Sequence, residues 1–167
     1  TIEIAEFGPG TPLAQVESVL RSRELGSPER RSGLLVYEAR LLNTIERRQR
    51  LAYGHEAGRV TSVNLIIDFD DVGDTRSAQR VFNELRALLV RTHGPPDVQI
   101  EDGDFGPGLS RRLSSGEFVR TYDWELDGRT LRFGIPDRND GRVRMEIRYA
   151  SELPPAEHGD WSLTRLR

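Results

Sequence analysis

The sequence contains no cysteine, which excludes disulfide bonds, thiolate metal sites and cysteine nucleophiles. It also contains no lysine, so arginine supplies all 24 basic side chains. Two interpretations of this bias stay open: codon usage in a high-GC genome, or recognition of carboxylates and phosphates by the planar guanidinium. No run of about 18 apolar residues occurs, and the sequence therefore predicts no membrane span.

The composition is that of a globular protein. Of the 167 residues, 36% are hydrophobic and 31% are charged, which suits one domain or two small units that share a core. The net charge of −3 gives no overall field that would attract nucleic acid or anionic lipid. The sequence begins at Thr1 rather than at Met. We expect an exported protein, periplasmic or secreted, with a cut fragment or a cytoplasmic protein as the alternatives.

Two segments carry the pattern of an amphipathic helix. The first starts at Thr11-Pro12, and Leu25-Gly26-Ser27-Pro28 ends it. The second begins at Asp74 or Thr75 and ends at His93-Gly94-Pro95-Pro96. Its apolar residues recur at intervals of three and four, which predicts a helix packed on a core. These residues are Ala78, Val81, Phe82, Leu85, Leu88 and Leu89.

Several runs predict β-strands, and they are residues 34–42, 50–54, 60–69, 118–126, 131–135 and 143–149. In the third run Val63, Leu65 and Ile67 share one face, whereas Ser62 and Asn64 share the other. For residues 101–108 we expect a loop. The pattern predicts an α+β fold made of tandem αβββ units, with the helices packed on one face of a mainly antiparallel sheet. Phe82, Leu85 and Leu89 are expected to pack against the aromatic residues of that sheet.

The two halves of the chain resemble each other in the order of their motifs. Leu51-Ala52-Tyr53-Gly54 matches Leu131-Arg132-Phe133-Gly134, and Gly58-Arg59-Val60 matches Gly141-Arg142-Val143. We interpret this as an internal duplication, with chance similarity between two αβββ units as the alternative. The predicted units are residues 1–72 and 73–153. They are followed by an extended tail, residues 154–167, held by Trp161, and the whole forms one compact domain.

This layout resembles a superfamily shared by the β-lactamase inhibitor proteins and the small lipoprotein of the outer-membrane barrel assembly machine. The residues that carry the resemblance are Gly10-Thr11, Val16, Leu25-Gly26-Ser27-Pro28, Tyr37 and Gly58-Arg59-Val60, then Val81, Gly94-Pro95-Pro96, Tyr122 and Gly141-Arg142-Val143. The inhibitor proteins carry disulfides, which this chain cannot form. The resemblance implies an exported bacterial protein that binds another protein with its sheet and loops.

No catalytic, cofactor-binding or metal-binding set can be assembled from the sequence. The three histidines, His55, His93 and His158, do not have the spacing of a His-Glu-x-x-His motif. Two acidic clusters are interpreted as a turn and a solvated loop, with cation binding as the alternative. These clusters are Asp68, Asp70 and Asp71, and Glu101, Asp102 and Asp104.

The last strand alternates apolar and charged residues, which predicts one buried face and one face in water. Cross-strand ion pairs would coat that outer face. Two interpretations stay open: an ordinary wet surface, or a charged surface where arginine anchors a partner protein. The candidate partner-binding residues are Asp123, Glu125, Arg132, Arg142, Arg144 and Arg148.

The sequence therefore favours a non-enzymatic protein-binding module without a cofactor. An exported bacterial inhibitor or an envelope-assembly accessory would fit the resemblance. One alternative is a ligand-binding or enzymatic α+β domain with a pocket between sheet and helices, which predicts converging polar groups. A toxin-neutralising immunity protein is the other. No oligomeric state is predicted.

Overall fold

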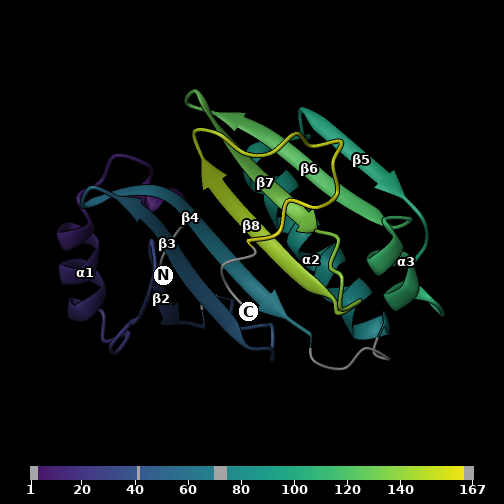
Figure 1. The fold of residues 1–167 in the computed structure, drawn as a ribbon, viewed down its shortest axis with the longest axis horizontal. Coiled ribbons are helices and arrows are strands. Elements are labelled where there is room, and N and C mark those ends of the chain that lie inside the picture. Colours follow the sequence, from purple (N-terminus) through teal and green to yellow (C-terminus); the bar gives the residue numbers. More distant parts are fainter. Residues whose placement is uncertain (1–3, 41, 70–74, 164–167) are drawn as a thin grey trace.

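The computed structural model describes residues 4–40, 42–69 and 75–163 (Figure 1). Its helices are α1 (Leu13–Ser22), α2 (Thr75–His93) and α3 (Leu109–Ser115), and a 3-10 turn precedes them at Ile4–Phe7. Its strands are β1 (Glu29–Arg31), β2 (Leu34–Glu38), β3 (Gln49–Glu56), β4 (Arg59–Asp68), β5 (Val98–Asp102), β6 (Val119–Leu126), β7 (Arg129–Ile135) and β8 (Arg144–Ala150).

The strands of the described chain form one 8-stranded sheet in the order β1-β2-β3-β4-β8-β7-β6-β5. Every neighbouring pair is antiparallel. The pairing of β4 with β8 joins the two halves at the centre of the sheet. The predicted α+β class with an antiparallel sheet is therefore confirmed.

The alternation of β4 explains how the centre of the sheet is built. Val63, Leu65 and Ile67 belong to the main core, and the register sets each of them opposite an apolar residue of β8. Because successive side chains of a strand point to opposite faces, Ser62 and Asn64 lie on the other side of the sheet. This division continues into β8, so the two faces of the sheet have different chemistry.

Helix α2 packs on the sheet through most of the apolar stripe that its sequence predicts, but Leu88, expected in that stripe, is 36% exposed. The ring of Phe82 stacks on Phe133 with centroids 5.4 Å apart and contacts Tyr122 at 5.8 Å. The helix ends where Gly94 adopts a φ of +81°, a conformation that few other residues tolerate, and the Gly94 amide donates to the carbonyl of Val90 at 2.8 Å. The expected packing of Phe82 against the sheet aromatics is confirmed.

Two strands, β1 and β5, the helix α3 and the 3-10 turn at Ile4–Phe7 were not predicted. Glu101 and Asp102, expected in a loop, belong to β5. Side chains of β5 are exposed or half-buried on both faces, so its sequence shows no clear alternation. Helix α3 is short and buries only Leu109 and Leu113, too little for a periodic signal. Asp74, one of two expected helix caps, lies outside the described residues.

The two halves follow the same order of elements, a helix and then four strands, with α3 added between β5 and β6. The edge strands β1 and β5 take equivalent places at the two ends of the sheet. This order agrees with a duplication, but common ancestry of units 1–72 and 73–153 stays a prediction. The boundary between those units falls within residues 70–74, outside the described part of the chain.

The prediction that the charged face of β8 lies in water is wrong. Arg144 and Glu146 expose only 1% and 0% of their surface. Residues 154–163 run across this face in front of β8, β7 and β6, on the side away from α2 (Figure 1). Trp161 of that segment is completely buried, with 0% exposed. The C-terminal segment is therefore a second cover of the sheet.

We predict that Leu85→Asp unfolds the domain. Leu85 exposes 2% of its surface on the core side of α2, so the substitution buries a carboxylate without a partner. The expected loss exceeds about 4 kcal/mol, a large part of the stability of an ordinary domain. Reversible denaturation followed by circular dichroism measures it.

The matched control is Leu88→Asp on the same helix, where the side chain is 36% exposed. Its effect should be within about 0.5 kcal/mol of wild type, as for most surface substitutions. An unchanged denaturation curve for Leu85→Asp would contradict the placement of α2 on the core.

Candidate functional site

We call the sheet face turned away from the main core the outer face, and residues 154–163 the strap. The strap forms no strand, so it is not held to the sheet by a ladder of main-chain hydrogen bonds. Pro154 and Pro155 begin it and favour an extended backbone at its start. The strap is instead held mainly by side chains that project from the outer face.

Trp161 is the central anchor of the strap. Its indole Nε1 donates to Oγ1 of Thr121 at 3.0 Å. The guanidinium of Arg132 lies over the indole, 5.6 Å from the ring centroid. The main-chain carbonyl of Trp161 accepts a hydrogen bond of 2.7 Å from Nη1 of Arg148. The outer face thus contacts both the ring and the backbone of this residue.

Arg132 and Arg148 stand directly opposite each other on β7 and β8. Like charges repel in that position, so each guanidinium needs its own partners. Arg132 makes a two-point ion pair with Asp123 at 2.7 and 3.0 Å and donates to the carbonyl of Pro154 at 2.5 Å. Arg148 donates through Nε to Oδ1 of Asn64 at 2.9 Å. Each arginine therefore binds one side chain of the sheet and one carbonyl of the strap.

Glu146 is a completely buried carboxylate that accepts hydrogen bonds from the strap. The amide of Leu163 lies 3.0 and 3.2 Å from its two oxygens, and the hydroxyl of Ser162 donates to Oε2 at 2.6 Å. A buried carboxylate is costly unless donors satisfy it. The strap supplies these donors.

Leu163 covers an apolar part of the outer face. It forms a small apolar cluster with residues from β2, β3 and β4, separate from the main core. The sheet members of this cluster are Leu34, Val36, Ala52 and Ile66. Burying a leucine side chain contributes about 1.5–3 kcal/mol, so the strap is held by apolar contact as well as by polar bonds.

Asp68 lies at the end of β4 between two arginines. Its oxygens pair with Nη2 of Arg50 at 2.5 Å and with Nε of Arg144 at 2.8 Å. Burial raises the pKa of Asp68, but the guanidiniums of Arg144 and Arg50 together outweigh burial, and the net effect is a lowered pKa. This arrangement is a structural ion pair. Asp70 and Asp71, the other members of this acidic cluster, lie outside the described residues.

The structure places the six candidate partner-binding residues in different environments. Asp123 and Arg132 form a buried pair, and Arg144 is buried beside Asp68. Arg148 is half-buried under the strap, whereas Glu125 and Arg142 are exposed. Those under the strap cannot contact a partner while the strap is in place.

Several residues of the site were not identified from the sequence. Glu146, Asn64 and Thr121 lie on the outer face, and Leu163 lies in the strap. The one usable signal was a tryptophan in a tail otherwise rich in proline and polar residues, which predicted that Trp161 holds the tail. Nothing in its spacing indicated which strands it contacts.

Asp137 contacts the strap in a different way from the other charges. Its amide donates to the carbonyl of Gly159 at 2.7 Å, and its buried Oδ1 has no hydrogen-bond partner. A Cβ at position 159 would overlap the Asp137 carboxylate, so a larger residue there would require that side chain to move. Burial, and then the charge of Asp160, raise the pKa of Asp137 to about 6. At neutral pH Asp137 is therefore charged, and one of its oxygens is buried beside the strap without a hydrogen-bond partner.

The remaining ionisable clusters are engaged in local contacts. In the second acidic cluster, Glu101 accepts from the hydroxyl of Tyr122 and lies 3.6 Å from Arg86 of α2. Across the described ranges 4–40, 42–69 and 75–163, no group of at least three histidine, aspartate or glutamate side chains is placed to hold a metal ion.

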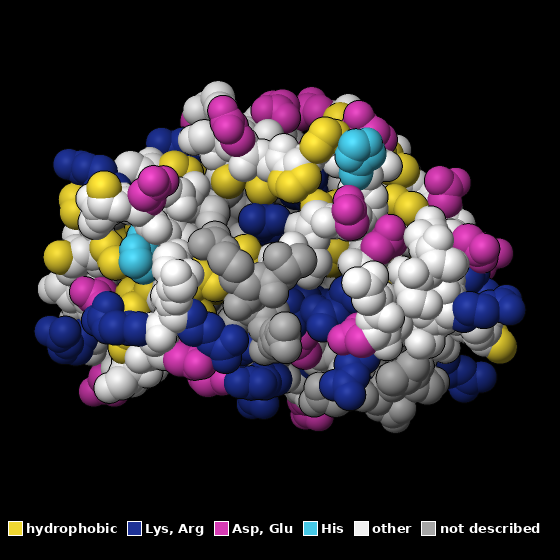
Figure 2. All heavy atoms as spheres, in the orientation of Figure 1, with side chains coloured by type: hydrophobic (Ala, Val, Ile, Leu, Met, Phe, Trp, Pro, Cys, Tyr) yellow, Lys and Arg dark blue, Asp and Glu magenta, His cyan; other side chains and the backbone are white. Residues whose placement is uncertain are grey.

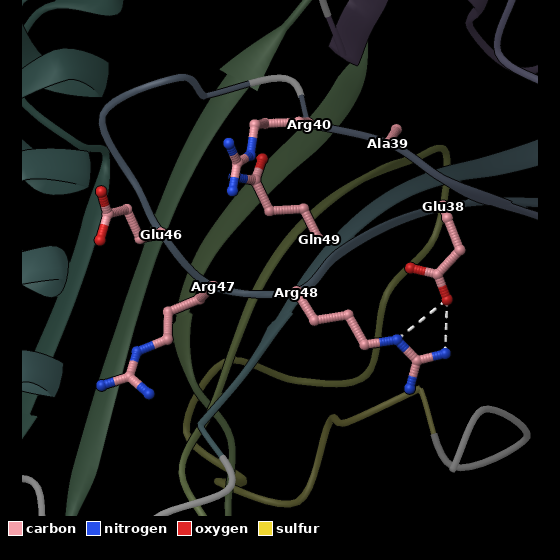
Figure 3. A pocket seen from close by; sticks show the side chains of 7 residues that line it. All are labelled: Glu38, Ala39, Arg40, Glu46, Arg47, Arg48 and Gln49. Atoms are coloured by element: carbon pink, nitrogen blue, oxygen red, sulfur yellow. Dashed lines mark hydrogen bonds and ion pairs between the residues drawn. The ribbon is translucent and has the colours of Figure 1, made fainter.

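The β2–β3 loop forms a shallow hollow of about 410 Å³ (Figure 3). Its lining residues are Glu38, Ala39, Arg40, Glu46, Arg47, Arg48 and Gln49. Arg48 pairs with Glu38, Arg47 donates to Ser77 of α2 at 3.0 Å, and Gln49 bonds to the loop backbone at Leu42 and Ile45. These polar groups are bonded to the protein's own side chains and backbone and do not converge on the hollow.

A second hollow, of about 680 Å³, lies beside α1. Its lining residues are Glu17, Arg21, Glu24, Gly26, Ser27, Pro28, Arg30 and Tyr37. Arg30 pairs with Glu17, and burial followed by the charge of Glu17 raises the pKa of Tyr37. These two hollows thus lie beside a loop and beside α1, not between α2 and the sheet.

The outer side of the molecule shows an uneven distribution of charge. In Figure 2 basic side chains gather along the lower edge, and acidic side chains are more frequent along the upper edge. In the same orientation β3 begins and β4 ends near the lower edge (Figure 1). All of these basic side chains are arginine, because the sequence has no lysine.

Comparison with known proteins found no matching family model, curated protein or solved structure. The resemblance to the β-lactamase inhibitor proteins and the assembly lipoprotein therefore stays a prediction. None of the helices in the described part of the chain is long and apolar enough to cross a membrane.

We predict that Asp137→Asn stabilises the protein at pH 7. A carboxyl whose pKa is raised binds more protons in the folded state, so wild-type stability falls as pH rises from 3.8 to about 6. The amide removes this dependence. Because the group is partly solvated, we expect a gain of about 1 kcal/mol, or roughly 2–4 °C in Tm. Thermal denaturation between pH 4 and pH 7 measures both effects.

The control is Glu157→Gln, which removes one charge from an exposed position of the strap. Its stability profile should follow that of wild type. If Asp137→Asn also followed the wild-type profile, the buried carboxylate would not be a source of strain beneath the strap.

Proposed function

We propose that this chain is a non-enzymatic protein-binding module whose outer face binds an extended segment of a partner protein in place of the strap. The proposal treats the strap as an occupant that the chain carries within itself. Export from a bacterial cell, with a role as an inhibitor or an envelope-assembly accessory, is the more specific form of the proposal and rests on the resemblance alone.

The observation that carries the proposal is how the strap is bound. Arg132 and Arg148 donate to the main-chain carbonyls of residues 154 and 161, and Glu146 accepts from the amide of Leu163. Peptide-binding proteins commonly use main-chain hydrogen bonds for affinity and side-chain binding sites, here called seats, for specificity. The outer face has both, because it also holds an indole and an aliphatic side chain.

The outer face is also suited to opening. When the strap leaves, the charged groups of Arg132, Arg148 and Glu146 become hydrated, which offsets part of the lost hydrogen bonding. Trp161 and Leu163 are not members of the main core, which lies on the opposite face of the sheet. Local opening of the strap therefore leaves the sheet and α2 in place.

We predict that the strap opens independently of the core in the full chain. The amides of Leu163 and Asp137, which take part in strap hydrogen bonds, should exchange with deuterium at least about 100-fold faster than those of Leu65 and Ile147 at the centre of the sheet. Native-state exchange followed residue by residue by NMR measures these rates.

The full-chain variant Trp161→Ala serves as a test of independence. It should raise exchange at Leu163 and Asp137 more than tenfold while the amides of Leu65 and Ile147 stay within about threefold of wild type. Equal protection of strap and core in the wild-type chain would show that the strap is a permanent part of the fold, and the proposed function would then be wrong.

A further inference from the structure

We infer that the outer face selects a partner segment that contains three consecutive residues: an aromatic residue, a small residue and an aliphatic residue. The main-chain N–H of the aliphatic residue must be free to donate a hydrogen bond. The inference rests on the proposed function, because it describes the occupant that replaces the strap. The strap shows the pattern as Trp161, Ser162 and Leu163. The occupant is taken to be a segment of a different protein.

The first position requires a flat ring with a hydrogen-bond donor. The seat is bounded by the guanidinium of Arg132, 5.6 Å from the ring centroid, and by the hydroxyl of Thr121, 3.0 Å from the indole nitrogen. A cation over an aromatic face is attractive, and tryptophan is the best of the aromatic residues for this contact. An aliphatic side chain at this position would remove the donor to Thr121 and the ring beneath Arg132.

The backbone of the segment fixes the register. Arg148 donates to the carbonyl of residue 161, and Glu146 accepts from the amide of residue 163. Proline at the third position removes that amide and leaves a completely buried carboxylate short of a donor. The middle residue is half-buried, and its hydroxyl adds a bond to Glu146, so a small side chain fits there.

The third position requires an aliphatic side chain, because an apolar patch of the sheet is exposed to water when this position is empty. The seat residues on β2, β3 and β4 are apolar and buried: Leu34, Val36, Ala52 and Ile66. Unlike the charged half of the outer face, this half gains nothing from hydration and stays unfavourable until an apolar group covers it. A partner that satisfied only the arginines would leave this patch in water.

The test uses a labelled synthetic peptide with the sequence of residues 152–163 and the full chain carrying Trp161→Ala and Leu163→Ala, which weaken the chain's own strap. Fluorescence anisotropy measures binding. We expect the peptide to bind this variant at least about tenfold more tightly than it binds wild type, because the intact strap competes within the same molecule.

Three altered peptides test the seats one at a time. Trp161→Ala removes the ring, Leu163→Ala removes the aliphatic side chain, and N-methylation of Leu163 removes only the amide hydrogen. Each should weaken binding at least about tenfold. A Glu157→Gln peptide is the matched control and should bind as the parent does, because Glu157 is exposed in the strap.

The outcomes separate the inference from the proposed function. Equal binding of all four altered peptides and the parent overturns the inference and leaves a non-selective peptide-binding face. Absence of binding by every peptide overturns the proposed function as well. If circular dichroism shows the double variant to be unfolded, the same peptides at millimolar concentration are titrated into wild type, with the indole N–H signal of Trp161 reporting displacement.

A second copy of the chain is the other possible occupant of the outer face. Analytical ultracentrifugation, which measures the oligomeric state, distinguishes it from a different protein. Concentration-dependent dimers of the wild-type chain that disappear in Trp161→Ala would identify exchange of straps between two copies. That result would overturn the inference that the outer face serves a different protein. A monomer at all concentrations, with selective peptide binding, supports it.

Discussion

Charge buried on a sheet face needs fixed partners, and this constraint shapes the whole outer side of the molecule. Arg132 and Arg148 face each other across two strands, and Glu146 is completely buried beside them. Such groups destabilise a fold when one partner is removed without replacement. Asp123 and Asn64 satisfy part of the requirement from within the sheet, and the strap satisfies the rest. The position of the strap is therefore set by the charges beneath it together with the contacts of Trp161 and Leu163.

The two faces of the sheet are covered by different kinds of interaction. On the core side, α2 packs through rings such as Phe82, whose contacts are numerous and do not involve charge. On the outer side, a segment without regular structure is held by hydrogen bonds to its backbone and by Trp161 and Leu163. Water cannot replace apolar packing of the first kind, whereas it can form hydrogen bonds with the polar groups of the second kind.

The sequence predicted the elements whose signal is local and missed those that depend on distant contacts. The stripe of α2 and the alternation of Val63, Leu65 and Ile67 are periodic, and each follows from burial on one side. Periodicity also indicated that Arg144 and Glu146 point away from the core, but it could not show that a later segment covers them. The alternation of apolar and charged residues is the same whether a later segment or water covers the charged face. The sequence therefore predicted exposure for Arg144 and Glu146, which are buried.

If the outer face binds a partner segment as proposed, the strap also sets how tightly that segment can bind. A protein whose binding-competent state is only fractionally populated shows an affinity reduced by that fraction, so a closed strap weakens every competing segment equally. Selectivity must then come from the seats, since the carbonyl contacts of Arg132 and Arg148 are available to any extended chain. In the proposed exchange, Asp137 would act against closure, because its Oδ1 is buried beside Gly159 without a hydrogen-bond partner, and burial and the charge of Asp160 both disfavour its ionised form. The contacts of Trp161 and Leu163 hold the strap, whereas the contact of Gly159 with Asp137 disfavours it. In the proposed exchange, a partner would therefore displace the strap more easily than the contacts of Trp161 alone would indicate.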